Sequence, residues 1–201
     1  MTICMLPRGN RPGRFELLHQ PSTSKTLAQP LRAAIMDSTS SFRQALQRAL
    51  FSGSCASATS ALALALRGRA EEGSAAGPLN GPTQWLWGER EAKTRELSLQ
   101  HTATGYTIHH LSAIWWAGFY ELLSGATGTS KSASRVAAEA AGITAFAFAV
   151  DYGLTPRRLR PGFEKHVSAR SIALVYVAFA AGLAASTLLR RTAQRRSLRY
   201  R

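Results

Sequence analysis

Two adjacent histidines, His109 and His110, lie in the apolar stretch GYTIHHLSAIWWAGFYELL, residues 105–123. An imidazole titrates near neutral pH and can also bind a metal ion. In a helix each residue turns by about 100°, so the two rings point to different sides and Tyr106 lies one turn before His110. A polar ring in an apolar environment needs a hydrogen-bond partner. We therefore expect both histidines to face the interior of a helix bundle.

Partners for these histidines can be sought on the other apolar stretches. Glu139 lies near one end of a later stretch, and the hydroxyls of Ser57 and Thr59 lie in the first one. A His–Glu pair could relay protons or bind a divalent cation. The simpler interpretation is that these groups form hydrogen bonds between helices and hold the bundle together. The candidate intramembrane polar site is Tyr106, His109, His110 and Glu139.

The sequence gives little support for a metal or a haem. A haem between helices needs histidines on facing helices, but His101 and His166 lie only at the edges of apolar stretches. Cys4 and Cys55 follow no disulfide or metal spacing, so we expect two unpaired thiols. No nucleophile elbow, Walker loop or zinc-protease motif is present. We predict no cofactor, no metal and no catalytic residue, and we favour a protein that is not an enzyme.

Four apolar stretches must position these residues. At a rise of about 1.5 Å per residue, a helix of roughly 18–22 residues is about 27–33 Å long, which matches the hydrocarbon core of a bilayer. A soluble bundle would show a polar stripe on each helix, and the first and fourth stretches carry no charged stripe. The sequence therefore predicts an all-α fold, an integral membrane bundle of four transmembrane helices. The predicted spans are residues 49–66, 102–123, 136–154 and 171–189.

Small residues recur at four-residue spacing in three of these stretches. Such spacing places them on one helix face, where two helices can approach closely and gain van der Waals contact. The pattern favours a compact bundle. Its members are Gly53, Ser57, Ala61 and Ala65; Ala137, Ala141, Ala145 and Ala149; and Ala178, Gly182 and Ser186.

The flanks of the apolar region differ from it in composition. Residues 1–42 are rich in Ser, Thr, Pro and Arg, which predicts a disordered basic segment. Residues 43–190 form the predicted transmembrane domain, and residues 191–201 a basic C-terminal tail. The sequence from Met36, MDSTSSFRQALQRALF, would also make a natural N-terminus before a helix.

The formal net charge is +14, but the basic residues lie at the edges of apolar stretches. Nucleic-acid-binding domains instead place basic residues along one face, with aromatic residues between them. We therefore expect no nucleic-acid partner. The positive-inside rule favours both termini in the cytoplasm of a multi-pass protein, although RRLR at residues 157–160 counts against it. The basic ends would lie against anionic lipid headgroups, and a homo-oligomer is possible.

A second notable stretch is GPLNGPTQWLWGE, residues 77–89. Its Gly-Pro pairs end any long helix, and an indole suits the membrane interface because its N–H can meet water. We predict that Trp85 and Trp87 are interfacial anchors. The alternative is a re-entrant loop that lines a cavity with Asn80 and Gln84.

This stretch, followed by HTATGYTIHH at residues 101–110, resembles a pattern in small uncharacterised integral membrane proteins of bacteria. There an Asn-containing turn leads to a Trp-Leu-Trp-Gly segment and then to a Gly-Tyr…His helix. The resemblance covers residues 77–123 and implies a multi-pass protein of the bacterial inner membrane. It implies no activity. Gln84 stands where that pattern has a histidine.

Three functions are compatible with these features. The leading hypothesis is a non-enzymatic membrane protein with a structural, assembly or stress-related role. The second is a small oligomeric transporter or channel subunit with a polar path through Tyr106, His110 and Glu139. The third is a metal- or haem-dependent membrane enzyme centred on His109 and His110.

Overall fold

The computed structural model describes the backbone of residues 23–126 and 131–200, and the side chains of residues 41–124 and 131–200. Within these residues the fold is all-helical. Four long helices carry it, and shorter helical turns connect them. The long helices are α1 (Thr23–Glu72), α4 (Thr104–Ala126), α5 (Ala133–Ala149) and α6 (Ala169–Arg199). The short ones are α2 (Gly77–Asn80), η1 (Gly81–Thr83), α3 (Gln84–Trp87), η2 (Glu91–Lys93), η3 (Leu99–Ala103), η4 (Val150–Leu154), η5 (Arg157–Leu159) and η6 (Phe163–Lys165).

The chain divides into two units at residues 40 and 41, and the first helix includes this boundary. It begins at Thr23, so it includes part of the segment of residues 1–42 that was expected to be disordered, and the division of the chain at residue 42 stays a prediction. The stretch just before residue 43 contains Ala, Leu, Arg and Met, which are good helix formers, and these outweigh the local Ser and Thr. Residues 1–22, with Cys4, lie outside the described part.

All four predicted spans lie within helices. The helices α1 (from Ser41), α5 with its continuation to Leu154, and α6 are long and apolar enough to cross a membrane. The described helix α4 is not among them, since His109, His110 and Glu121 lower its mean hydropathy. The structure thus supports three of the four predicted spans. Helix α6 continues to Arg199, so most of the predicted tail is helical.

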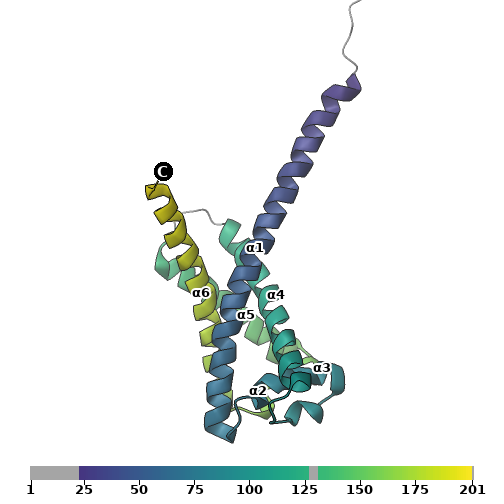
Figure 1. Cartoon of the computed structure of the whole chain (residues 1–201), viewed down its shortest axis with the longest axis vertical. Helices are drawn as coiled ribbons and strands as arrows, with labels where there is room; N and C mark the ends of the chain where they lie inside the picture. Colours follow the sequence, from purple (N-terminus) through teal and green to yellow (C-terminus); the bar gives the residue numbers. More distant parts are fainter. Residues whose placement is uncertain (1–22, 127–130, 201) are drawn as a thin grey trace, which may run out of the picture. The chain divides into compact units, whose positions relative to one another are not determined.

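The helices of residues 41–201 run alternately up and down. Figure 1 places α2 and α3 at one end of the bundle and the C-terminal end of α6 at the other. Helices α1 and α6 pack closely because Gly182 has no side chain: an added Cβ would lie 2.6 Å from the Cα atom of Ala56. At Gly53 an added Cβ would lie 2.6 Å from the Cα atom of Ile114, so α1 also lies against α4.

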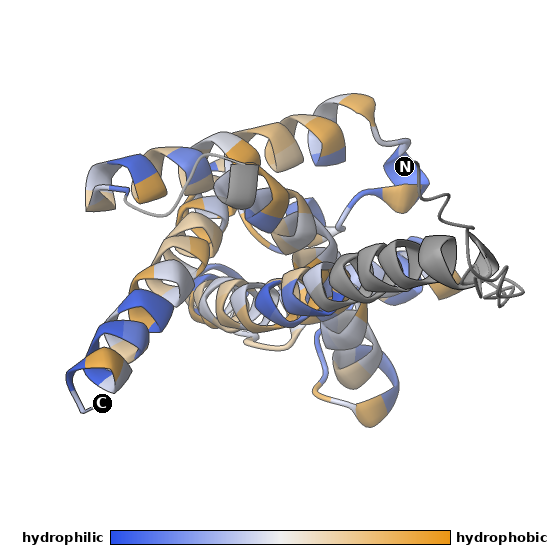
Figure 2. Ribbon diagram, turned by 90° about the horizontal axis from the view of Figure 1, so that it is seen from above, coloured by the Kyte–Doolittle hydropathy of each residue, from blue (hydrophilic) through white to orange (hydrophobic). Residues whose placement is uncertain are grey.

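Two apolar clusters form the core. The first joins all four long helices through Ala56, Ala113, Ala117, Tyr120, Ala140, Phe179 and Leu183. The second lies where α1 and α6 meet the connecting loops and contains Leu64, Phe163, Val167, Ile172 and Val175. In Figure 2 pale and orange residues predominate along the first part of α6, whereas its C-terminal end is mostly blue, that is, hydrophilic.

The small-residue pattern has two outcomes. On α1 and α6 it lies in contacts between helices, as predicted, because Gly53, Ser57 and Gly182 face neighbouring helices. On α5 it does not: Ala137, Ala141, Ala145 and Ala149 are exposed. The buried face of α5 instead carries Val136, Ala140, Thr144 and Ala147. Alanine is common all round this helix, so spacing alone could not identify its packed face.

Candidate functional site

His109 lies on the buried face of α4, in line with Ala113 and Ala117. Its Nε2 atom is 3.0 Å from the hydroxyl oxygen of Ser60 on α1. That hydroxyl donates its proton to the carbonyl of Ala56 at 2.7 Å. The Ser60 oxygen therefore accepts, and His109 Nε2 carries the hydrogen. The predicted partner helix is confirmed, and the partner is Ser60 in place of Ser57 or Thr59.

His110 and Tyr106 lie on the less buried side of α4. Their rings stack, with centroids 5.7 Å apart and planes inclined by 30°. Tyr106 also approaches His109, at a centroid distance of 6.5 Å. The Nδ1 atom of His110 is buried and has no hydrogen-bond partner among the described residues. Thus three of the four residues of the predicted polar site lie together.

Glu139 lies at the other end of the bundle. It accepts hydrogen bonds from Lys131 at 2.6 Å, Ser124 at 3.1 Å and Arg135 at 3.3 Å. Ser124 follows His110 by 14 residues of α4, which is about 21 Å along the helix axis. The structure therefore separates Glu139 from the histidines, and a polar path through all of them has no support in this arrangement.

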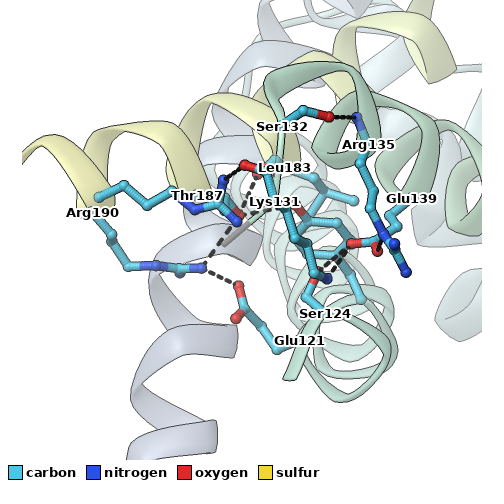
Figure 3. Close-up of polar contacts among 11 residues, drawn as sticks. Glu121, Ser124, Lys131, Ser132, Arg135, Glu139, Leu183, Thr187 and Arg190 are labelled. Atoms are coloured by element: carbon cyan, nitrogen blue, oxygen red, sulfur yellow. Dashed lines mark hydrogen bonds and ion pairs between the residues drawn. The ribbon is translucent and has the colours of Figure 1, made fainter. Parts of the chain in front are cut away.

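A second buried carboxylate, Glu121, lies close to that cluster (Figure 3). Arg190 of α6 donates to it at 2.6 Å, and only 6% of the Glu121 side chain is exposed. Arg190 also lies over the ring of Phe51 on α1, 5.8 Å from its centroid. We call Glu121, Lys131, Glu139 and Arg190 the ion-paired end.

The cluster of polar contacts at this end joins three helices. In Figure 3 the sticks of Arg190 and Thr187 come from α6, and that of Arg190 points toward Glu121 of α4. Thr187 also shares a hydrogen bond with the buried hydroxyl of Tyr120 at 2.9 Å. Arg191, which follows Arg190 in the sequence, donates to the carbonyl of Lys131 at 2.8 Å. These contacts hold the ends of α4, α5 and α6 together.

Asp151 lies at the opposite end of α5, in the turn η4. The hydroxyl of Tyr176 on α6 donates to its carboxylate at 2.5 Å. The rings of Phe148, Tyr152 and Tyr176 contact one another beside it, with centroids 5.2 to 6.3 Å apart. The sequence analysis assigned no role to Asp151, and its pairing with Tyr176 was missed.

A cavity of about 490 Å³ lies between α4, α5 and α6, with Ser60 of α1 at its wall. Asp151, Tyr176 and His109 all line it. The rest of the wall is mostly aromatic and aliphatic, and includes Trp115, Trp116, Ala147 and Phe179. The cavity thus combines a few converging polar groups with apolar walls, an arrangement typical of small-molecule binding sites.

The connecting loops close the cavity on the side of α2 and α3. Pro82, Trp85, Leu159 and Pro161 line it from these loops. Gly81 and Gly162 cross closely: a Cβ on Gly81 would lie 2.8 Å from the carbonyl carbon of Gly162. Gly162 has φ +82°, a left-handed conformation that favours glycine.

The stretch of residues 77–89 folds inward. Asn80 is fully buried and donates to the carbonyls of Thr94 and Glu96. Gln84 is also fully buried and donates to the carbonyl of Arg160 at 2.5 Å. Neither residue lines the cavity, so both support the loops that do.

The two predicted interfacial anchors are partly exposed. The indole of Trp85 donates to the carbonyl of Arg160 at 3.0 Å. The ring of Trp87 packs edge-on against His101 at a centroid distance of 5.4 Å. Both side chains therefore fix the loops to their neighbours, and their location at a membrane interface stays a prediction.

A further buried histidine, His166, joins the loops to α1. Its Nδ1 atom is 2.8 Å from Glu72, whose other oxygen is 2.9 Å from Arg95. Its Nε2 atom donates to the carbonyl of Ala92 at 2.6 Å. The sequence had suggested only that His166 lies at the edge of a span. Here it joins Glu72 of α1 to the carbonyl of Ala92 in the loops.

Metal binding finds no geometric support in the described residues, which contain no group of three His, Cys, Asp or Glu side chains able to hold an ion. Cys55 is a free, half-buried thiol. No protein family, curated protein or solved structure matches this chain. The site must therefore be interpreted from its own geometry.

Proposed function

We propose that this chain is an integral membrane protein whose bundle binds an apolar small molecule between α4, α5 and α6. This proposal keeps the expectation of a non-enzymatic membrane protein and replaces the structural, assembly or stress-related role with ligand binding. The observation that carries it is the cavity of about 490 Å³, with its mostly apolar walls and a few polar groups, among them His109, Asp151 and Tyr176.

The proposal includes α4 as a fourth span. Its packing against α1 at Gly53 and against α5 supports this, because α4 would cross the bilayer with its neighbours. Its outward side carries Leu111 and Trp115, which are 60% and 65% exposed. Exposed apolar side chains of this size are typical of surfaces that contact lipid or another protein.

The orientation we propose places both termini in the cytoplasm of a bacterium. Of the 25 Lys and Arg residues, 15 lie in residues 1–48, 127–135 and 190–201, and ten lie in residues 67–101 and 155–170. The more basic side is cytoplasmic under the positive-inside rule. Anionic lipid headgroups would then contact the basic end of α6.

A ligand would enter the cavity from the side. Leu111 and Trp115 line the cavity and are also exposed on the surface of α4. An opening beside them would face the lipid if α4 spans the bilayer. A molecule that partitions into the membrane could therefore reach the site without crossing water.

The test uses a neutral fluorinated probe, 4′-fluoro-4-tert-butylbiphenyl, and the full chain in lipid nanodiscs. We expect a separate bound ¹⁹F resonance that saturates at one equivalent. Ala147→Phe should abolish it, because Ala147 is buried and lines the cavity. Ala145→Phe is the matched control, since Ala145 is exposed on the same helix. A resonance that never saturates, or that survives Ala147→Phe, would refute the proposal.

A further inference from the structure

The carboxylates of this bundle differ in what neutralises them. Glu121 is paired with Arg190 at 2.6 Å and Glu139 with Lys131 at 2.6 Å. Near the loops, Glu72 is paired with Arg95 at 2.9 Å. A carboxylate in a low-dielectric interior needs such a partner, because its desolvation is otherwise uncompensated.

Asp151 is the exception. It is half-buried, and the one hydrogen bond that it receives from a described residue comes from the neutral hydroxyl of Tyr176. No ion pair involves it among the described residues, and no Lys or Arg lines the cavity into which it is placed. The cavity therefore contains an acidic group without a cation.

The walls of the cavity suit a cation as well. Its aromatic lining includes Trp85, Trp115, Trp116 and Tyr176. The faces of these rings carry negative electrostatic potential and attract organic cations, an effect that strengthens when water is excluded. The rings also provide apolar contact for a hydrophobic substituent.

From these observations we propose that the cavity binds a lipophilic organic cation, with the cationic group beside Asp151 and the apolar part against Trp115, Trp116 and Phe179. This inference rests on the proposed function and names the ligand class. The position of Asp151 in the turn η4, at the end of α5, places it where the cationic group could remain near the headgroups. The apolar part would extend toward the bundle interior.

The experiment compares two probes of the same shape. One is the neutral 4′-fluoro-4-tert-butylbiphenyl, and the other is its cationic isostere, in which nitrogen replaces the quaternary carbon. Both are titrated by ¹⁹F NMR into the full chain in nanodiscs of zwitterionic lipid, so that headgroup charge does not attract the cation. We expect the cation to bind at least tenfold more tightly, which is about 1.4 kcal/mol.

Asp151→Asn keeps the shape of the side chain and removes its charge. We expect this variant to lose most of the preference for the cation and to keep only the smaller part that the aromatic rings contribute. Binding of the neutral probe shows that the variant cavity is intact. Tyr176→Phe serves as a second variant, because it removes the hydroxyl and keeps the carboxylate, so the preference for the cation should persist.

The outcomes separate the two proposals. If the neutral probe binds and the cation binds no more tightly, the cation inference is overturned and the proposed function stands. A cation preference that is undiminished in Asp151→Asn overturns the inference as well. If neither probe gives a saturable signal that Ala147→Phe removes, the proposed function fails and the inference fails with it.

Discussion

The carboxylates at the two ends of α5 have opposite kinds of partner. At the first, Glu139 is surrounded by Lys131, Arg135 and Ser124. At the second, Asp151 receives one hydroxyl and lines a cavity. Full pairing is what a structural contact requires, since an unpaired charge in the interior is destabilising. The contrast indicates that the ion-paired end stabilises the fold and that the cavity is available for a ligand.

The largest loss of stability is expected when a cation is removed from the ion-paired end. Arg190→Met leaves Glu121 buried without its partner, and we expect a loss of about 3 kcal/mol in the free energy of unfolding. Unfolding in mixed detergent micelles, followed by circular dichroism, measures it. Arg195→Met is the control, because Arg195 is exposed on the same helix, and it should change stability by less than about 0.5 kcal/mol. Equal stability of both variants would show that the ion pair is not structural.

A second prediction concerns the close contact between α1 and α6 at Gly182. Gly182→Ala would place a Cβ 2.6 Å from the Cα atom of Ala56, so α1 and α6 must separate. We expect a loss of about 2 kcal/mol, the usual effect of overpacking. Gly142→Ala, with nothing within 4 Å of its added Cβ, should be neutral or should stabilise α5 by up to about 1 kcal/mol. The same unfolding measurement applies, and equal effects of the two substitutions would contradict this packing.

A third prediction tests the neutral partner of Asp151. Tyr176→Phe removes the hydroxyl that donates to the carboxylate, and we expect a loss of about 1.5 kcal/mol, typical of a hydrogen bond to a charged group. Tyr152→Phe is the matched control. The hydroxyl of Tyr152 is buried and has no hydrogen-bond partner among the described residues, so its removal should be neutral or slightly stabilising. Unfolding of both variants under identical conditions decides the matter. A larger loss for Tyr152→Phe would overturn the assignment.

Sequence reasoning succeeded where a single helix decides the answer. Apolar length predicted the four helices, and the polarity of His109 predicted that it would face another helix. The hydroxyls expected as partners on α1 were those of Ser57 and Thr59. The observed partner is Ser60, the residue after Thr59. Each of these inferences depends on helix length or helix periodicity, which the sequence displays directly.

It failed where the register between two helices decides. Glu139 was considered as a partner of the histidines, but α4 and α5 run in opposite directions, so Glu139 meets Ser124 near the turn. The same antiparallel register brings Asp151 to the cavity beside Ser112 and His109. Counting residues along α4 and α5 from the turn that joins them would have indicated that Asp151 lies near His109. No count along one chain could show that Arg190 of α6 reaches Glu121, since that contact depends on how three helices pack.

The smallest effect that we predict concerns the hydrogen bond of His109. Ser60→Ala removes the acceptor of the His109 Nε2 hydrogen, and we expect a loss of about 1 kcal/mol, as for other hydrogen bonds between membrane helices. Ser57→Ala is the control one turn away, since the buried Ser57 hydroxyl has no hydrogen-bond partner among the described residues. Removing that hydroxyl should leave the free energy of unfolding unchanged.

If Ser60→Ala also leaves stability unchanged but alters probe binding in the cavity, His109 orients the ligand more than it holds the helices together. If stability falls and binding is unchanged, His109 is a structural contact, as the residues of the ion-paired end are. Asp151 is then the polar group of the cavity on which ligand binding depends.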